Sequence, residues 1–164
     1  MKYYTASLIL LCLGLVSTDL SAQTRNNEAQ KAEILSAVDR FFDALEQSDR
    51  AELENTTLAG SVFIASTTST DGQVNNSTRS RAEFIQALSN KDAKRLERYW
   101  NPTLLIREGI AVFWAPYDFH IDGIFSHCGI DSFQLFRSAG VWKIGSSSYT
   151  VERQNCEPSP LGPI

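Results

Sequence analysis

The sequence lacks most of the features that mark the common functional classes of protein. It has no basic stripe and carries a net charge of -4, so nucleic acid is not expected as a partner. It contains no glycine-rich nucleotide-binding loop, which argues against a nucleotide cofactor. No serine stands in an elbow motif, and no internal repeat or low-complexity stretch is present. We therefore expect one domain that needs no cofactor.

The chain also lacks an apolar run long enough to span a bilayer, which needs roughly 20 residues. The run Ala6–Val16 is too short, but Lys2 before it and Ala22 after it give the segment the pattern of a signal peptide. We expect residues 1–22 to be cleaved, so that the protein is secreted or periplasmic and keeps no membrane anchor. The alternative is an anchor that stays uncleaved.

The remaining chain is long enough for a single domain with one core. We place this domain at residues 23–153 and expect the proline-rich tail, residues 154–164, to lie outside the fold. Two cysteines remain after cleavage, Cys128 and Cys156. In an oxidising compartment they form a disulfide that pins the tail against the sheet, or they stay separate thiols. The sequence leaves both alternatives open.

Local signals place helices and strands along the domain in a definite order. Asp49 offers an N-cap, Asp71-Gly72 is a hairpin turn signal, and Ser80 with Glu83 is typical of a capping box. The predicted elements are a helix at about 28–47, a helix at about 50–57, a hairpin of 62–69 with 73–79, a helix at about 81–88, and a meander of strands from 95 to 152. This order predicts an α+β domain with three helices packed on a bent, mainly antiparallel sheet.

Three turns set the pairing of the last strands. They are Glu108-Gly109, Asp122-Gly123 and Ala139-Gly140. Counting back from these turns places Asp118 directly opposite His127. The same count places Asp131 opposite both Trp114 and Ser148. Directly opposite residues have Cβ atoms about 4.5–5.5 Å apart, so these groups are predicted to interact.

One face of the predicted sheet is apolar at one end and polar at the other. Its members are Leu105, Val112, Trp114, Phe133, Leu135, Trp142 and Ile144, followed by Asp118, His120, His127, Asp131 and Ser148. We expect the helices to cover the apolar end and to leave the polar end open as a pocket, with Tyr99 at its rim unless Pro102 breaks the ladder. The opposite face is predicted to carry Phe113, Tyr117, Phe119, Ile121, Ile124, Ile130 and Phe136. We expect this aromatic face to form a homodimer interface.

The order of elements resembles the nuclear transport factor 2-like (NTF2-like) superfamily. The likeness is carried by Phe41–Leu45 with Asp49, Trp114–Phe119, Phe125–Gly129 and Gly140–Ile144. The second and third of these segments resemble exported bacterial members near the DUF4440 and SnoaL-like branches. The resemblance implies a cone-shaped fold with a pocket between the helices and the concave sheet face. No catalytic residue of the family can be assigned to this sequence by motif. The first helix lacks the tyrosine of the isomerase-type members, and the sequence does not bring together the Asp-Arg-Asp set of the hydrolase-type members.

Three functions are compatible with this sequence. The first is the binding of a small, mostly apolar molecule, for which the predicted pocket residues are Tyr99, Trp114, Asp131 and Ser148. The second is a cofactor-independent isomerase, dehydratase or cyclase with His127 as general base and Asp118 as its orienting partner, a pair that is alternatively structural. The third is a dimeric interaction module whose pocket is filled by its own side chains. No metal site is expected, since no second carboxylate joins the two histidines.

Overall fold

The computed structural model describes residues 13–69, 71–89 and 91–164, and the side chains from residue 27 onward. Most of the predicted signal peptide, residues 1–22, lies outside the described residues. The chain divides into two units, residues 1–33 and 34–164, which are treated separately. The helix α1 (Leu13–Glu46) has residues in both, and its part in the first unit carries an exposed ion pair of Lys31 with Glu28 at 2.8 Å. None of the described helices is long and apolar enough to cross a membrane.

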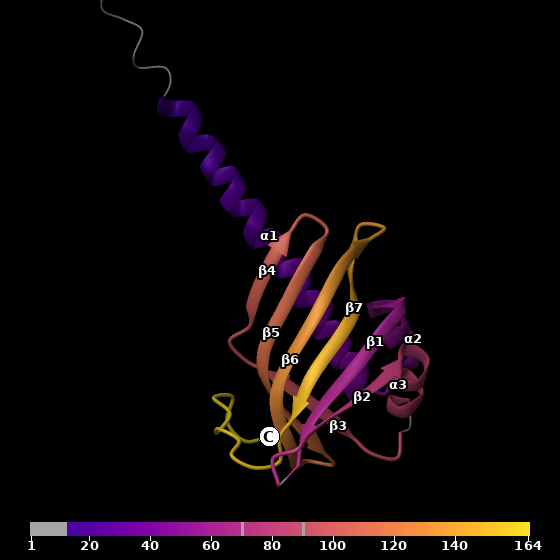
Figure 1. The fold of residues 1–164 in the computed structure, drawn as a ribbon. Helices are drawn as coiled ribbons and strands as arrows, with labels where there is room; N and C mark the ends of the chain where they lie inside the picture. Colours follow the sequence, from indigo (N-terminus) through magenta and orange to yellow (C-terminus); the bar gives the residue numbers. More distant parts are fainter. Residues whose placement is uncertain (1–12, 70, 90) are drawn as a thin grey trace, which may run out of the picture. The chain divides into compact units, whose positions relative to one another are not determined.

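The predicted helices are confirmed in the second unit, together with the side chains that begin them. From Ile34 onward α1 buries apolar residues at helical spacing, ending with Leu45. The helix α2 (Arg50–Thr56) begins at Asp49, whose carboxylate accepts a hydrogen bond from the Glu52 backbone N–H at 3.1 Å. The helix α3 (Arg81–Leu88) begins with the predicted capping box, formed by Ser80 and Glu83. Figure 1 shows α2 and α3 beside each other, close to β1.

The seven strands form one mixed sheet. They are β1 (Thr57–Thr68), β2 (Val74–Ser80), β3 (Arg95–Tyr99), β4 (Thr103–Arg107), β5 (Ile110–Ile121), β6 (Ile124–Ser138) and β7 (Val141–Val151). Their order is β2-β1-β7-β6-β5-β3, with β4 also paired to β5 (Figure 1). Only the pair β1 and β7 is parallel among these strands, so the sheet is mainly antiparallel as predicted. The predicted α+β fold is therefore confirmed.

The predicted turns are also confirmed, because each joins two antiparallel strands that pair with each other. Glu108, Asp122 and Ala139 all have positive φ, between 50° and 54°, and each is followed by glycine. The pairs predicted next to the turns are present as well. They are Leu105 with Val112, Thr103 with Trp114, Ile121 with Ile124, and Leu135 with Ile144. A turn thus fixes the register of the residues nearest to it.

Farther from the turns the predicted register is wrong, because two β-bulges intervene. One bulge leaves Ser126 of β6 unpaired, since the register shifts between Phe119 and His120, and it places Asp118 opposite Cys128, not opposite His127. A second bulge leaves Gly145 unpaired, since the register shifts between Gln134 and Leu135. The first strand of the predicted meander is also divided, at Trp100–Pro102, into β3 and β4.

The partners predicted for the other site residues change with these shifts. Asp131 lies opposite Ala115 and Tyr149, not opposite Trp114 and Ser148. Trp114 lies opposite Ser132, and Ser148 is paired with the same Ser132 from the other side. Tyr99 lies opposite Tyr117, not opposite Asp118.

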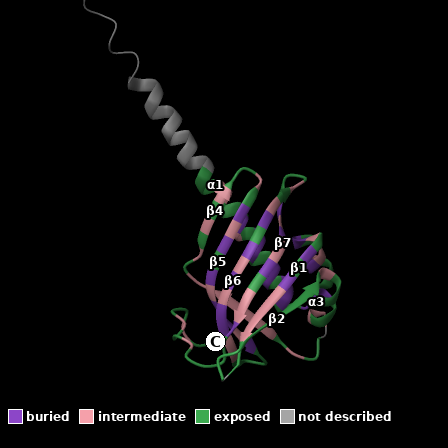
Figure 2. Ribbon diagram, viewed as in Figure 1, coloured by how far each residue is buried: buried purple, intermediate pink, exposed green. Residues whose placement is uncertain are grey.

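The bulges also reverse the two faces that were predicted for β5. Phe113 and Tyr117, predicted on the outer face, are buried in the structure with exposed fractions of 0% and 1%. Trp114, predicted in the pocket, is 51% exposed. Figure 2 shows buried and exposed residues alternating along the strands, as expected for a sheet with one covered face. An extra residue in a strand moves every later side chain to the opposite face.

The helices cover the inner sheet face through a cluster of aromatic rings. The rings of Phe63 and Phe84 are stacked with their centroids 3.7 Å apart. Phe41 of α1 contacts both rings and meets Phe133 edge-on at 5.7 Å. Such aromatic contacts contribute about 0.5–1.5 kcal/mol each beyond the area that they bury. The cluster holds the helices against one end of the sheet.

The C-terminal tail, predicted to lie outside the fold, is attached to it at two points. The structure has a disulfide between Cys128 and Cys156, with Cα atoms 5.9 Å apart. The guanidinium of Arg98 donates a hydrogen bond of 3.0 Å to the carbonyl of Gly162. The tail therefore passes along the sheet near β3 and does not hang free.

Candidate functional site

A cavity of about 330 Å³ lies on the inner face of the sheet, beyond the aromatic cluster. The strands contribute odd-numbered residues to it, because the register places these on one face. The lining residues are Phe41, Leu45, Ala65, Thr67, Ser77, Arg79, Phe84, Leu88, Glu97, Tyr117, Phe119, His127, Asp131, Phe133, Ser147, Tyr149, Val151 and Arg153. Most are apolar or aromatic, which is typical of a small-molecule site with a few polar groups.

Two carboxyl groups meet in this cavity, Asp131 of β6 and Glu97 of β3. Both strands flank β5, where Asp131 faces the small side chain of Ala115 and Glu97 faces Phe119. The two carboxyl groups share a hydrogen bond. Asp131 is only 1% exposed, and its Oδ2 atom has no hydrogen-bond partner among the described residues.

Burial in this cavity makes both carboxyl groups hard to ionise. Loss of solvation raises the pKa of Asp131 from 3.8 to about 7, although its hydrogen bond with Glu97 acts in the opposite direction. Loss of solvation also raises the pKa of Glu97 well above its usual value, and the nearby carboxylates of Asp131 and Asp118 add to this rise. We assign the shared proton to Glu97, because its pKa is raised by the bond that lowers the pKa of Asp131.

Two tyrosines stand beside the carboxyl pair and remain neutral. Tyr149 lies directly opposite Asp131 on β7, and its pKa is raised mainly by burial. Tyr117 donates its hydroxyl hydrogen to the carbonyl oxygen of Thr150 at 2.7 Å. Burial raises its pKa too, so this donor stays in place throughout the physiological range. Tyr149 has no hydrogen bond of this kind among the described residues and is the freer of the two hydroxyl groups.

His127 lines the same cavity, as an uncharged ring. Its pKa falls from 6.5 to about 4, first because the ring is buried and then because Arg153 is close. The ring stacks on Phe119 with centroids 4.9 Å apart, and its Nδ1 atom lies 3.0 Å from the Ser126 hydroxyl. Neutral His127 can therefore exchange a proton with a ligand, but it does so without help from Asp118.

Asp118, predicted to orient His127, lies on the other face of the sheet. Arg98 donates two hydrogen bonds to its carboxylate, at 2.9 and 2.6 Å, and His120 lies 3.4 Å away. Burial opposes ionisation of Asp118, but the bonds from Arg98 hold the pKa below its usual value. The predicted pair of Asp118 with His127 is therefore wrong, and Asp118 has a structural partner instead.

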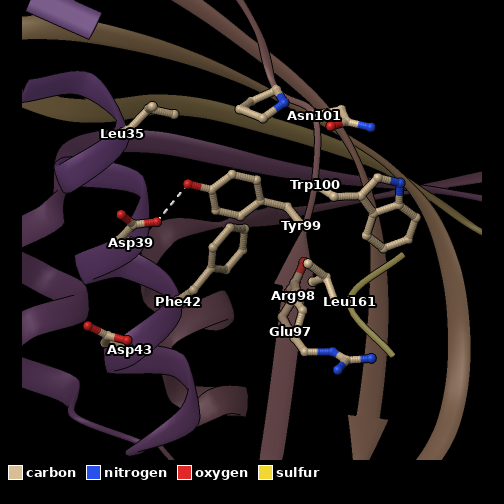
Figure 3. Close-up of a pocket in the computed structure, with 11 residues that line it drawn as sticks. Leu35, Asp39, Phe42, Asp43, Glu97, Arg98, Tyr99, Trp100, Asn101 and Leu161 are labelled. Atoms are coloured by element: carbon tan, nitrogen blue, oxygen red, sulfur yellow. Dashed lines mark hydrogen bonds between the residues drawn. The ribbon is translucent and has the colours of Figure 1, made fainter. Parts of the chain in front are cut away.

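The other predicted pocket residues are dispersed. Tyr99 lies in a second, open depression of about 630 Å³, shown in Figure 3. There its hydroxyl donates a hydrogen bond of 2.7 Å to Asp39 of α1, which joins the helix to the strand. Trp114 and Ser148 are exposed on the outer face. Of the predicted pocket residues, Asp131 lines the cavity, and the predicted base His127 joins it there.

The structure adds Glu97, Tyr149 and Arg79 to the site. Glu97 could have been predicted from the sequence. It lies two residues before Tyr99 in an expected strand, and such residues lie on the same face of a sheet. Tyr149 was hidden by the bulge at Gly145, which moves it from the outer face to the inner one. In the part of the chain that the structure describes, no group of three or more potential ligands is placed to hold a metal.

Comparisons with known proteins identify the fold. No protein-family model and no curated protein matches the sequence. An NTF2-like protein from Cytophaga hutchinsonii has a TM-score of 0.63 at 17% identity, covering 74% of this chain and 98% of that one. An NTF2-like protein of unknown function from Silicibacter pomeroyi has a TM-score of 0.57 at 16% identity, covering 77% and 98%. A candidate dehydratase of the NTF2-like family from Streptomyces avermitilis has a TM-score of 0.58 at 14% identity, covering 76% and 97%.

Proposed function

We propose that this chain, which has the fold of the NTF2-like superfamily, binds a small molecule in the cavity that contains Glu97 and Asp131. The ligand has a mostly apolar body and one polar group that reaches the carboxyl pair. The observation that carries this proposal is the unpartnered Oδ2 atom of Asp131, buried in a cavity that aromatic and polar side chains line together. A buried polar atom without a partner costs about 1–3 kcal/mol, and a ligand that donates a hydrogen bond to it recovers this cost.

The size of the cavity favours binding over a purely structural role. An interaction module whose interior is filled by its own side chains should have no cavity of ligand size. Ligand sites start at about 300 Å³, and the cavity here measures about 330 Å³. The rings of Phe41, Phe84 and Phe133 line this cavity without filling it.

The test of binding is a native mass spectrum of the protein produced in an oxidising compartment. A reproducible extra mass on the wild type is expected. The variant Ala65→Phe, which fills the cavity from β1, should lose this mass. The matched control Ser66→Phe places the same ring on the opposite face of the same strand and should keep it. Equal extra mass on both variants, or none on the wild type after gentle isolation, contradicts the proposal.

A second candidate function is proton transfer without a cofactor, as in an isomerase or dehydratase. It is favoured by the pKa of about 7 for Asp131, since a general base works best when its pKa is near the working pH. Once the ligand is known, it is incubated with the protein in D₂O. Deuterium appearing at carbon with wild type and not with Asp131→Asn supports catalysis, and no exchange with either leaves binding as the function.

We also propose that the protein is exported and acts outside the cytoplasm. The disulfide of Cys128 with Cys156 supports export, because such bonds persist in oxidising compartments. The mass of the exported product should match a chain that begins at Gln23. A product that still begins at residue 1 contradicts the cleavage. Assignment to the DUF4440 or SnoaL-like branches stays a prediction.

A homodimer through the outer sheet face remains a proposal, with corrected residues. Leu105, Ile110 and Trp114 are 65%, 51% and 51% exposed, and the register places them on this face. Such a cluster of exposed apolar side chains favours a partner. Sedimentation should give a dimer for wild type and a monomer for Trp114→Glu. The control Gln86→Glu, on exposed α3, should remain a dimer, and a wild-type monomer contradicts the proposal.

A further inference from the structure

The cavity is chemically asymmetric, which restricts the ligand more than its size does. The carboxyl groups of Asp131 and Glu97 lie inside it. Arg79 and Arg153 also line the cavity, but both are exposed, so they stand where it meets solvent. The cavity therefore offers a negative group at depth and positive groups at its opening.

We propose that the ligand is a small amine, whose ammonium group binds the carboxylate of Asp131 inside the cavity. This inference rests on the proposed binding function and specifies its ligand class. The geometry behind it is the arrangement of the two carboxyl groups: Glu97 donates to Asp131, and Oδ2 of Asp131 is left with no partner among the described residues. An ammonium group carries several donors and no acceptor, so it complements an atom that can only accept.

The walls of the cavity suit a cation as well. Six aromatic side chains line it, namely Phe41, Phe84, Tyr117, Phe119, Phe133 and Tyr149. The face of an aromatic ring attracts an ammonium group, by about 2 kcal/mol when the contact is shielded from water. A neutral alcohol can also donate to Asp131, but it gains neither this attraction nor the charge pairing. The amine should therefore bind more tightly than an alcohol of the same shape.

The arginines at the opening predict a second feature of the ligand. Arg79 lies near Tyr149, and Arg153 lies near His127, as their effects on the pKa values of these groups show. A carboxylate placed at the far end of the amine would lie close to one of them. An amine with a distal carboxylate should therefore bind more tightly than the plain amine.

The affinity for an amine should depend on pH through the groups that face Asp131. Glu97 of β3 and Tyr149 of β7 are the nearest, with Tyr117 of β5 and His127 of β6 farther along the same face. The tyrosines stay neutral, and His127 is neutral above pH 4. Asp131 changes its charge between pH 6 and pH 8, because its pKa is about 7. Because Asp131 must lose its proton before the ammonium group binds, the affinity for the amine should rise about tenfold from pH 6 to pH 8.

The experiment is isothermal titration of the wild-type protein at pH 6 and pH 8 with four probes. They are 2-phenylethylamine, 2-phenylethanol, 3-phenylpropionate and 4-(2-aminoethyl)benzoate. At pH 8 we expect the amine to bind at least tenfold more tightly than the alcohol, the propionate to bind least, and the aminobenzoate to bind most tightly. At pH 6 the preference for the amine over the alcohol should shrink about tenfold.

Two variants decide whether the carboxyl pair causes this preference. Asp131→Asn keeps the shape of the side chain but removes its charge, and it should reduce the preference at pH 8 to less than threefold. Glu97→Gln keeps a neutral donor beside the Asp131 carboxylate, so it should retain the preference at pH 8. The control Asp43→Asn removes an exposed carboxylate outside the cavity and should leave it unchanged. If Asp131→Asn does not fold, the wild-type comparison tests the point, because the preference should shrink when Asp131 is protonated at pH 6.

The outcomes separate this inference from the binding function on which it rests. Binding of the alcohol as tightly as the amine, or an amine preference in Asp131→Asn as large as that of wild type, overturns the inference and leaves the cavity as a binding site. Failure of all four probes to bind, combined with a native mass spectrum free of ligand, overturns both.

Discussion

Replacing Asp131 with asparagine should make the protein more stable at neutral pH, although the residue is almost completely buried. The folded state holds a carboxyl group whose pKa is about 7, whereas in the unfolded chain it is about 3.8. Between these two values the unfolded chain releases the proton and the folded protein keeps it. The folded state therefore loses stability as the pH rises from about 4 to 7, and no further above that.

The size of this effect follows from the two pKa values. Each pH unit between them costs 1.36 kcal/mol, so the full penalty above pH 7 is about 4 kcal/mol. Asparagine cannot ionise and avoids the penalty while keeping the volume of the side chain. We expect Asp131→Asn to be about 4 kcal/mol more stable than wild type at pH 8, and only about 1 or 2 kcal/mol more stable at pH 5.

Urea denaturation of both proteins at pH 5 and pH 8 measures this difference. The comparison must be made between variants, because His127 has the opposite effect on wild type. The folded protein keeps this ring neutral down to about pH 4, so it loses stability as the pH falls below 6.5. The two effects partly cancel between pH 4 and 6.5. A variant that is less stable than wild type at pH 8, or a difference that does not grow with pH, refutes the reasoning. Asp43→Asn, at an exposed site, should change the stability by less than about 0.5 kcal/mol.

Three further substitutions test other parts of the structure. His127→Gln should lose less stability in acid than wild type. At pH 4 we expect the free energy of unfolding to differ by about 2 kcal/mol, a value reduced for solvent screening because the ring is partly exposed. Urea denaturation across pH measures this difference. Cys156→Ser opens a cross-link between residues 28 apart and should lower the free energy of unfolding by about 3 kcal/mol; equal stability of oxidised and reduced wild type would contradict this. Gly129→Ala should lower the melting temperature markedly, because the added Cβ would lie 2.1 Å from the Thr150 carbonyl oxygen. An unchanged melting temperature would mean that the β7 backbone shifts to make room for the Cβ at little energetic cost.

The features predicted correctly from the sequence are those fixed by neighbouring residues. Ser80 and Glu83 form a cap within one turn of helix, so their spacing alone identifies it. The turn at Asp122-Gly123 requires positive φ at both residues, which these types tolerate. For this reason the order of helices and strands, and with it the fold class, follows from local signals in the sequence.

The site was predicted less well, because it depends on distant residues. The bulge at Ser126 has no strong local signal in the sequence, yet it turns Asp118 away from the cavity. The hydrogen bond between Glu97 and Asp131 joins strands on either side of β5, which no count from a hairpin turn reveals. The disulfide was one of two open alternatives, since spacing alone does not decide the pairing of cysteines.

Asp131 and Glu97 form a carboxyl pair that shares a proton inside the cavity. We would test this first by following the ¹³C carboxyl resonance of Asp131 through a pH titration in wild type and in Glu97→Gln. We expect an inflection near pH 7 in wild type and a different inflection when Glu97 is replaced. An inflection below pH 5 in wild type, unchanged in the variant, would show that Asp131 is an ordinary solvated carboxylate and would contradict the account.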